Sequence, residues 1–179
     1  MQIEKISAYL TELKGGSWTR KSDNSLYELQ RVYENGLIHL EANISAQDTV
    51  FIEYIYEGKE LKKEVNFGLG YIDTLFVNSW NEYGKALTYK NSAVRRTYKG
   101  CNLTVMVLSN ENQKTLKSRT MLYQDNFPHK IEFRIGDSIL ANETVYFTNY
   151  IFDKRKNWTS RIIVKPEDTY MEVRTLIYE

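Results

Sequence analysis

The chain has 179 residues, which suits one domain of typical size, predicted here to span residues 1–179. Its 24 Lys and Arg residues nearly balance 23 Asp and Glu residues, and the net charge of +1 excludes a general nucleic-acid binder. A single cysteine, Cys101, excludes an intrachain disulfide and a Cys-based zinc site, and two distant histidines do not indicate a metal centre. No apolar run approaches the roughly 20 residues that cross a bilayer, and the first residues do not resemble a signal peptide. We therefore expect a soluble intracellular protein with no membrane partner.

The first predicted element is a short amphipathic helix over residues 3–13. Ile3, Ile6, Leu10 and Leu13 recur at the three- and four-residue spacing of one helical face. The pair Gly15-Gly16 follows and would end the helix, because glycine readily adopts the left-handed conformation found after helices.

Everything after this segment is typical of short strands. Aromatic and β-branched residues alternate with polar ones, and Asn35-Gly36 is a strong hairpin signal. Strands that recur every 8–12 residues predict an all-β antiparallel barrel or sandwich. The predicted strands are 26–33, 37–44, 49–57, 61–67, 71–78, 85–89, 93–98, 103–109, 116–123, 130–135, 144–150, 160–165 and 169–178.

Charged residues alternate along the last strands. Glu172 and Arg174 share one face of the final strand, as do Lys130 and Glu132 on an earlier one. Such a face is either solvated on the outside or part of a mixed lumen that holds one amphipathic ligand. The cluster Arg95-Arg96 with Lys99 is interpreted as a solvated basic loop.

The triplet Gly16-Ser17-Trp18 resembles the Gly-x-Trp pattern at the start of lipocalin-like barrels. In those barrels the indole closes the narrow end, so Trp18 is predicted to be a structural plug, with Arg174 stacked on it. The resemblance implies a lipocalin-like antiparallel β-barrel with a short N-terminal α-helix.

A longer similarity is to the S-type phycobiliprotein lyases. The segment from Gly16 resembles their opening motif, and Glu143-Thr144-Val145-Tyr146-Phe147 looks like their Glu-Arg-Ile-Trp-Phe strand. Asn157 to Arg161 occupies the place of their arginine pair, and the separation from Arg161 to Glu179 agrees with the family. Thr159 replaces the first arginine, residues 150–156 form an insert, and the middle of the chain aligns poorly, with Ser79-Trp80-Asn81 placed on the family's Trp-rich segment.

The resemblance implies a lyase that attaches a bilin, an open-chain tetrapyrrole, to a cysteine of an apo-phycobiliprotein subunit. The lyase would have no cofactor of its own, and would bind a phycoerythrobilin- or phycocyanobilin-type substrate received from a bilin-synthesising reductase. The implied location is the plastid stroma or the cyanobacterial cytoplasm, and a homodimer stays open.

Bilin chemistry suggests a role for each candidate residue, since propionates need a cation, pyrrole nitrogens a carboxylate and the conjugated rings aromatic walls. The candidate catalytic carboxylates are Glu143 and Glu179, and the candidate ligand-binding residues are Arg161, Arg174, Trp80, Tyr146 and Phe147. Two other functions stay open: a lipocalin-like carrier of a fatty acid, haem or other apolar ligand without catalysis, and a structural protein whose barrel is filled with side chains.

Overall fold

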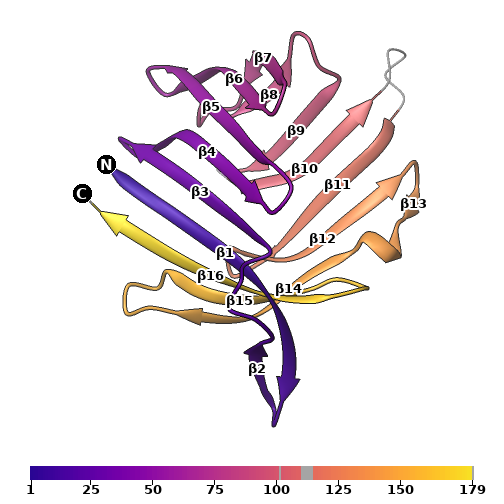
Figure 1. Cartoon of the computed structure of the whole chain (residues 1–179). Helices are drawn as coiled ribbons and strands as arrows, with labels where there is room; N and C mark the ends of the chain where they lie inside the picture. The colour runs from indigo at the N-terminus through magenta and orange to yellow at the C-terminus, as the bar shows by residue number, and fades with distance from the viewer. Residues whose placement is uncertain (101, 110–114, 179) are drawn as a thin grey trace. The chain divides into compact units, whose positions relative to one another are not determined.

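A computed structural model describes residues 1–100, 102–109 and 115–178, so Cys101 and Glu179 lie outside the described residues. The described chain is all-β, and its resolved strand pairs are antiparallel, as predicted (Figure 1). Its strands are β1 (Gln2–Lys14), β2 (Ser17–Arg20), β3 (Tyr27–Glu34), β4 (Leu37–Ser45), β5 (Thr49–Glu57), β6 (Glu60–Gly68), β7 (Tyr71–Trp80), β8 (Ala86–Tyr89), β9 (Val94–Lys99), β10 (Asn102–Ser109), β11 (Thr115–Gln124), β12 (Phe127–Ile135), β13 (Ser138–Ile139), β14 (Val145–Phe152), β15 (Trp158–Val164) and β16 (Thr169–Tyr178).

The predicted N-terminal helix is wrong, because residues 3–13 lie within strand β1. This strand pairs with β3 on one side and β16 on the other. Its alternate residues Glu4, Ile6 and Ala8, which share one face of the strand, are 3%, 4% and 0% exposed. Within the described residues the only helical segment is the 3-10 turn η1 (Ala141–Glu143), and none of their helices has the length and apolar character of a membrane span.

The later strands agree with the sequence patterns to within about three residues at each end. The predicted hairpin at Asn35-Gly36 is confirmed, since the two residues have φ angles of 50° and 77° between β3 and β4. Both angles are positive, as a two-residue type I′ turn requires. Strands β2 and β13 were not predicted, and both are short.

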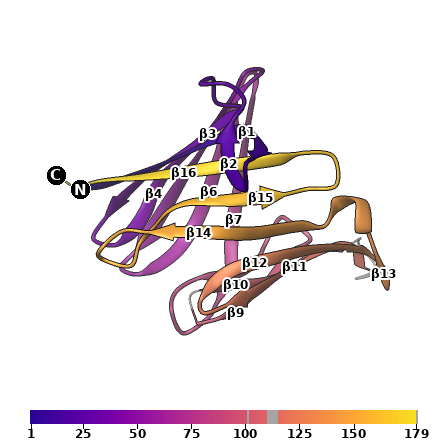
Figure 2. The same ribbon diagram turned by 90° about the horizontal axis from the view of Figure 1, so that it is seen from below.

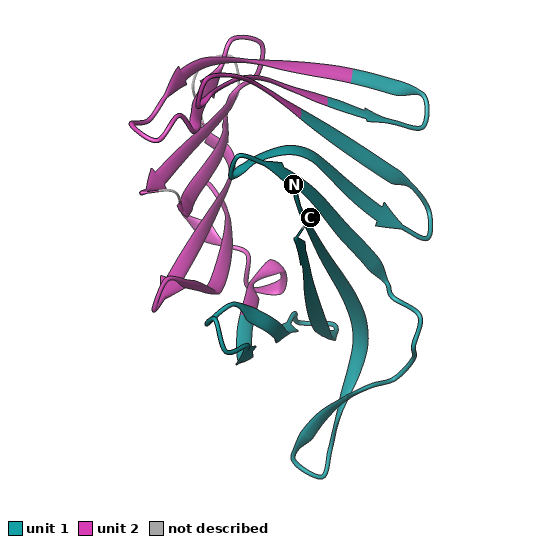
Figure 3. Ribbon diagram, turned by 90° about the vertical axis from the view of Figure 1, so that its left-hand side faces the viewer, with its two compact units in different colours: residues 1–53, 66–72, 147–179 teal, residues 54–65, 73–146 magenta. Residues whose placement is uncertain are grey.

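The chain divides into two compact units, and each is described by itself (Figure 3). Unit 1 comprises residues 1–53, 66–72 and 147–179, and unit 2 comprises residues 54–65 and 73–146. In unit 1 the neighbouring strands run in the order β4, β3, β1, β16, β15 and β14. In unit 2 they run in the order β7, β8, β9, β10, β11 and β12.

The two chain ends meet in unit 1. Gln2 of β1 is paired with Tyr178 of β16, so the ends lie side by side (Figure 1). Strands β14, β15 and β16 follow one another across the same sheet (Figure 2). The hairpin of β15 and β16 matches the sequence prediction, and it places Arg161 opposite Glu172.

Candidate functional site

The candidate site lies on one face of the unit 1 sheet, where ionised side chains occupy positions that normally hold apolar ones. Ala8 of β1 is paired with Glu172 of β16, and Ile6 is paired with Arg174. Directly paired residues point to the same face of a sheet. The buried side of β1 and the alternating charges of β16 therefore meet on one surface.

Glu172 is one of two buried carboxylates on this face. Its Oε2 lies 2.6 Å from Nε of Arg161, and the two side chains are 7% and 13% exposed. The hydroxyl of Tyr27 donates a hydrogen bond of 2.5 Å to the other carboxylate oxygen. Burial, followed by the negative charge of Glu172, raises the pKa of Tyr27, which keeps this phenol protonated and donating.

Glu4 is the second buried carboxylate. Nε of Arg174 lies 2.6 Å from Oε1, while the hydroxyl of Tyr33 and Nη1 of Arg31 donate to Oε2 over 2.7 and 3.2 Å. Burial alone would raise the pKa of Glu4, but the hydrogen bond from Tyr33 and the charges of Arg174 and Arg31 together lower it. The carboxylate is therefore held in its charged form.

Aromatic rings surround the two arginines. The guanidinium carbon of Arg161 is 4.5 Å from the ring centre of Trp158 and 4.4 Å from that of Phe147. The guanidinium carbon of Arg174 lies 5.1 Å from the same indole. All three distances fall within the range of cation–π attraction. Trp158 thus connects two cations, and we refer to Arg161, Arg174 and Trp158 as the Arg–Trp cluster.

A pocket of about 170 Å³ opens beside this cluster and is lined by Trp158, Arg174, Leu176 and Tyr178. Arg174 uses only Nε in its ion pair with Glu4, and within the described residues its two outer nitrogens have no hydrogen-bond partner. Asp153 also lines the pocket, but its carboxylate accepts hydrogen bonds from the backbone of Arg155 and from Asn157. The open donors of the pocket therefore favour an anion beside an aromatic wall.

Three of the predicted ligand-binding residues, Arg161, Arg174 and Phe147, lie on or beside this face. The predicted stacking of Arg174 on Trp18 is wrong, because its aromatic partner is Trp158. Trp18 lies on β2, opposite Leu13 of β1, and is only half-buried. Sequence reasoning missed the roles of Trp158 and Glu4, although Trp158 stands within the segment that resembles the arginine pair of the lyases.

Three further candidates, Glu143, Tyr146 and Trp80, lie in unit 2, while Glu179 lies outside the described residues. Glu143 belongs to η1, before the start of β14, and its carboxylate lies 2.6 Å from Nζ of Lys117. Tyr146 is 48% exposed, with Nζ of Lys130 at 5.4 Å from its ring centre. Trp80 packs against the apolar core of unit 2, and its indole N–H donates to the carbonyl of Leu61. Trp80 therefore has a structural role in the described chain.

Unit 2 contains a buried ion pair of its own. Arg96 donates to both carboxylate oxygens of Glu64, over 2.8 and 3.2 Å, and Tyr89 donates to the same carboxylate. The interpretation of this segment as a solvated basic loop is thus wrong for Arg96, whose side chain is 22% exposed. Within the described residues, no group of acidic, histidine or cysteine side chains could hold a metal ion.

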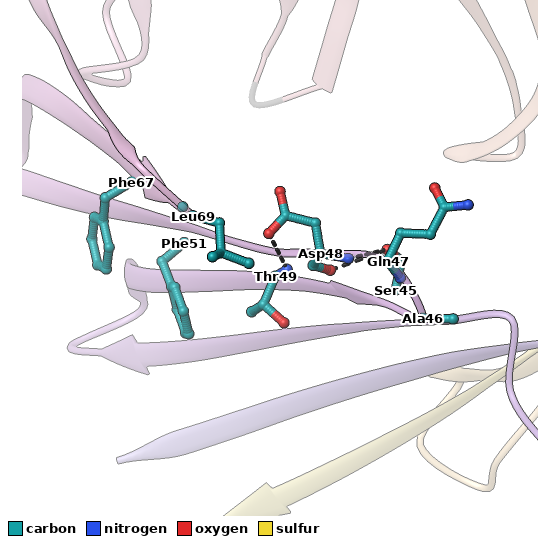
Figure 4. A pocket seen from close by; sticks show the side chains of 9 residues that line it. Ser45, Ala46, Gln47, Asp48, Thr49, Phe51, Phe67 and Leu69 are labelled. Atoms are coloured by element: carbon teal, nitrogen blue, oxygen red, sulfur yellow. Dashed lines mark hydrogen bonds between the residues drawn. The ribbon is translucent and has the colours of Figure 1, made fainter.

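A groove in unit 1 lies at the turn between β4 and β5 (Figure 4). It has a volume of about 510 Å³, and the stacked rings of Phe51 and Phe67 form one wall. Polar groups of the groove form hydrogen bonds within the turn. The Ser45 hydroxyl donates to the carbonyl of Asp48 and accepts from its amide, and the Asp48 carboxylate accepts a hydrogen bond from the Thr49 amide. The groove therefore lacks the converging charged groups of the Arg–Trp cluster.

No protein-family model matches the chain, and no curated protein is similar to it in sequence. Among solved structures, the chain is similar to a porin-like protein from Bacteroides uniformis, with a TM-score of 0.54 and 12% identity, over 98% of this chain and 97% of that one. At this identity the likeness concerns the fold alone. A putative outer membrane lipoprotein-sorting protein domain from Vibrio parahaemolyticus is 11% identical over 99% of this chain and 85% of that one, and its TM-score of 0.41 is too low to inform the fold.

Proposed function

We propose that this protein binds a small amphipathic organic anion at the Arg–Trp cluster of unit 1. The observation that carries the proposal is one indole contacted by two guanidinium groups, one of which lines a pocket and pairs with Glu4 through Nε alone among the described residues. Arginine binds carboxylates in a planar geometry, and an aromatic wall beside it suits a conjugated or apolar ligand body.

The size of the pocket limits which part of a ligand it accepts. Its volume of about 170 Å³ lies below the roughly 300–1,000 Å³ of sites that enclose a drug-sized molecule. The pocket would therefore hold the anionic end of the ligand, with the remainder extending across the sheet face. A lipocalin-like barrel would present such a face to its ligand.

An open-chain tetrapyrrole is the specific ligand that we propose, on the strength of the resemblance to the S-type lyases. Arg174 would bind a propionate, Trp158 would stack on a pyrrole ring, and Glu172 would accept from pyrrole N–H groups. A bilin held in its protonated form is more electrophilic, and a cysteine of the acceptor phycobiliprotein would supply the nucleophile. In this lyase proposal Glu172 takes the role expected of Glu143 and Glu179.

A carrier without catalysis is the second candidate, because Glu143 is paired with Lys117 in unit 2. Co-expression with a bilin source separates the two candidates. A lyase would form a coloured complex and would transfer the chromophore to an apo-phycobiliprotein by a thioether bond. A carrier of bilin would bind without transfer, whereas a carrier of fatty acid would remain colourless.

Substitution of Arg174 tests the binding site itself. Titration of the protein with biliverdin should show that Arg174→Gln weakens binding by about 1.5–3 kcal/mol, the range for a hydrogen bond to a charged group. Arg20→Gln is the matched control, because Arg20 also stacks on an aromatic ring, Tyr9 at 3.9 Å, but does not line the pocket. Equal affinity of the two variants and the unmodified protein would contradict the proposal.

A further inference from the structure

Unit 2 contains an apolar pocket that is independent of the proposed function in unit 1. It has a volume of about 220 Å³, and its walls are the side chains of Val94, Met106, Leu108 and Phe133. Arg119 is one of two cations that line it, the other being Lys117, and no acidic side chain of the described residues lines it. The pocket thus combines apolar walls with uncompensated positive charge.

The register of the sheet explains how these groups come together. Arg119 of β11 is paired with Met106 of β10 on one side and with Phe133 of β12 on the other. Met106 is in turn paired with Arg96 of β9. Residues paired across neighbouring strands share a face. Arg119 is therefore flanked by two apolar side chains on a face where the other arginine is already neutralised.

The charges on this face differ in how they are compensated. Arg96 is held by both oxygens of Glu64, and Nζ of Lys117 lies 2.6 Å from the Glu143 carboxylate. Arg119 has no hydrogen-bond or ion-pair partner within the described residues. Burial, together with the positive charge of Arg96, lowers the pKa of Arg119, so the site disfavours a lone cation there.

We propose that this pocket binds an apolar monocarboxylate, with the carboxylate paired to Arg119 and the aliphatic chain against Met106, Leu108 and Phe133. A bidentate contact would neutralise Arg119, whose charge has no partner among the described residues. The volume of about 220 Å³ favours a medium-chain acid over a larger ligand. A dianion is less suited, since Lys117 is already paired with Glu143.

The test is calorimetric titration with octanoate and with octanol, which share the apolar chain and differ in charge. We expect the unmodified protein to bind octanoate, and Arg119→Met to weaken that binding by about tenfold to one hundredfold, as for loss of a hydrogen bond to a charged group. Arg134→Met is the matched control, because Arg134 is paired with Ser118 and so points to the opposite face. It should leave octanoate binding unchanged.

A second measurement does not depend on the folding of any variant. In the unmodified protein, octanoate should shift the methyl resonance of Met106, which lines the pocket, and leave that of Met171 in unit 1 in place. Octanol should produce a weaker shift at the same concentration. Absence of octanoate binding, equal binding of octanoate and octanol, or equal affinity of Arg119→Met and the unmodified protein would each overturn the proposal.

Discussion

At the scale of single residues, Glu4 shows how a strand can bury an ionised side chain. It is 3% exposed, and its hydrogen-bond partners come from residues 31, 33 and 174. Burial of a lone carboxylate is unfavourable, and the three donors offset that cost. Glu4 therefore stabilises the sheet only while it is ionised and all three donors are present.

Replacement of Glu4 should make the protein less sensitive to acid. The pKa of Glu4 is held below its ordinary value of 4.5, so its stabilising contribution is present at neutral pH and is lost as the pH falls below that value. We expect Glu4→Gln to lower the free energy of unfolding at neutral pH by about 3 kcal/mol. Urea denaturation should show a smaller difference from the unmodified protein at an acidic pH at which Glu4 is protonated in the folded state.

The matched control for this prediction is Glu57→Gln. The Glu57 side chain is 82% exposed and pairs with Lys62, so the substitution should change stability by under about 1 kcal/mol. If Glu4→Gln lowers the free energy of unfolding equally at both pH values, the shape of the side chain, and not its charge, accounts for the effect.

The candidate site was only partly predictable from the sequence, because its buried ion pairs join strands that are far apart along the chain. Arg161 could be selected because it stands in the segment that resembles the arginine pair of the S-type lyases, and Arg174 because it shares a charged face of the final strand with Glu172. Glu4 could not, because its partner Arg174 is 170 positions away and a carboxylate near a chain end is usually exposed. The pairing of distant strands, which brings the two together, is not encoded in any local spacing.

At the scale of elements, local patterns predicted the strands from β3 onward except the two-residue β13, because apolar and polar residues alternate in them and turn residues separate them. β1 was misassigned because Ile3, Ile6, Leu10 and Leu13 mimic the helical period, while the face of the strand that is buried against the sheet carries Glu4, Ile6 and Ala8. Since one of those positions is charged and another is small, the two-residue period of β1 is hidden in its hydrophobicity. Tertiary pairing with β3 and β16 decides the conformation.

The loop between β7 and β8 depends on Gly84. This residue has φ of 72°, and a Cβ placed there would collide with the backbone oxygen of Lys59. Backbone strain of this kind costs about 1–3 kcal/mol. We expect Gly84→Ala to lower the free energy of unfolding by more than that, because the collision with Lys59 adds to the strain.

Gly58→Ala is the control for this substitution. Gly58 has a similar φ of 59°, but nothing lies within 4 Å of the position that a Cβ would take, so it should cost about 1 kcal/mol from backbone strain alone. Chemical denaturation of both variants measures the difference. If both variants lose the same free energy of unfolding, the loop at Gly84 moves away from Lys59 at no energetic cost.

At the scale of the molecule, the two units cannot be separated by cutting the chain once. Unit 2 is made of residues 54–65 and 73–146, so β5 and β6 each run from one unit into the other without a break. Continuous strands transmit local unfolding along their length. The division into units is therefore compatible with cooperative unfolding of the whole chain.

Single-tryptophan variants can measure this cooperativity. Trp158 reports on unit 1 and Trp80 on unit 2, and replacement of the other two tryptophans by phenylalanine isolates each signal. We expect the two fluorescence transitions in urea to share one midpoint, as in two-state unfolding. Two separate midpoints would show that the units unfold independently.

The buried ion pairs also affect how stability varies with temperature. Glu4, Glu64 and Glu172 are among the buried side chains, and none of the large side chains of the described residues is less than 2% exposed. Unfolding therefore hydrates charged groups together with apolar ones, and these two kinds of surface change the heat capacity in opposite directions. The heat-capacity increment of unfolding should fall below the usual value of about 12–15 cal/mol/K per residue. The free energy of unfolding then varies little with temperature, so the folded state stays nearly as stable on cooling or moderate warming.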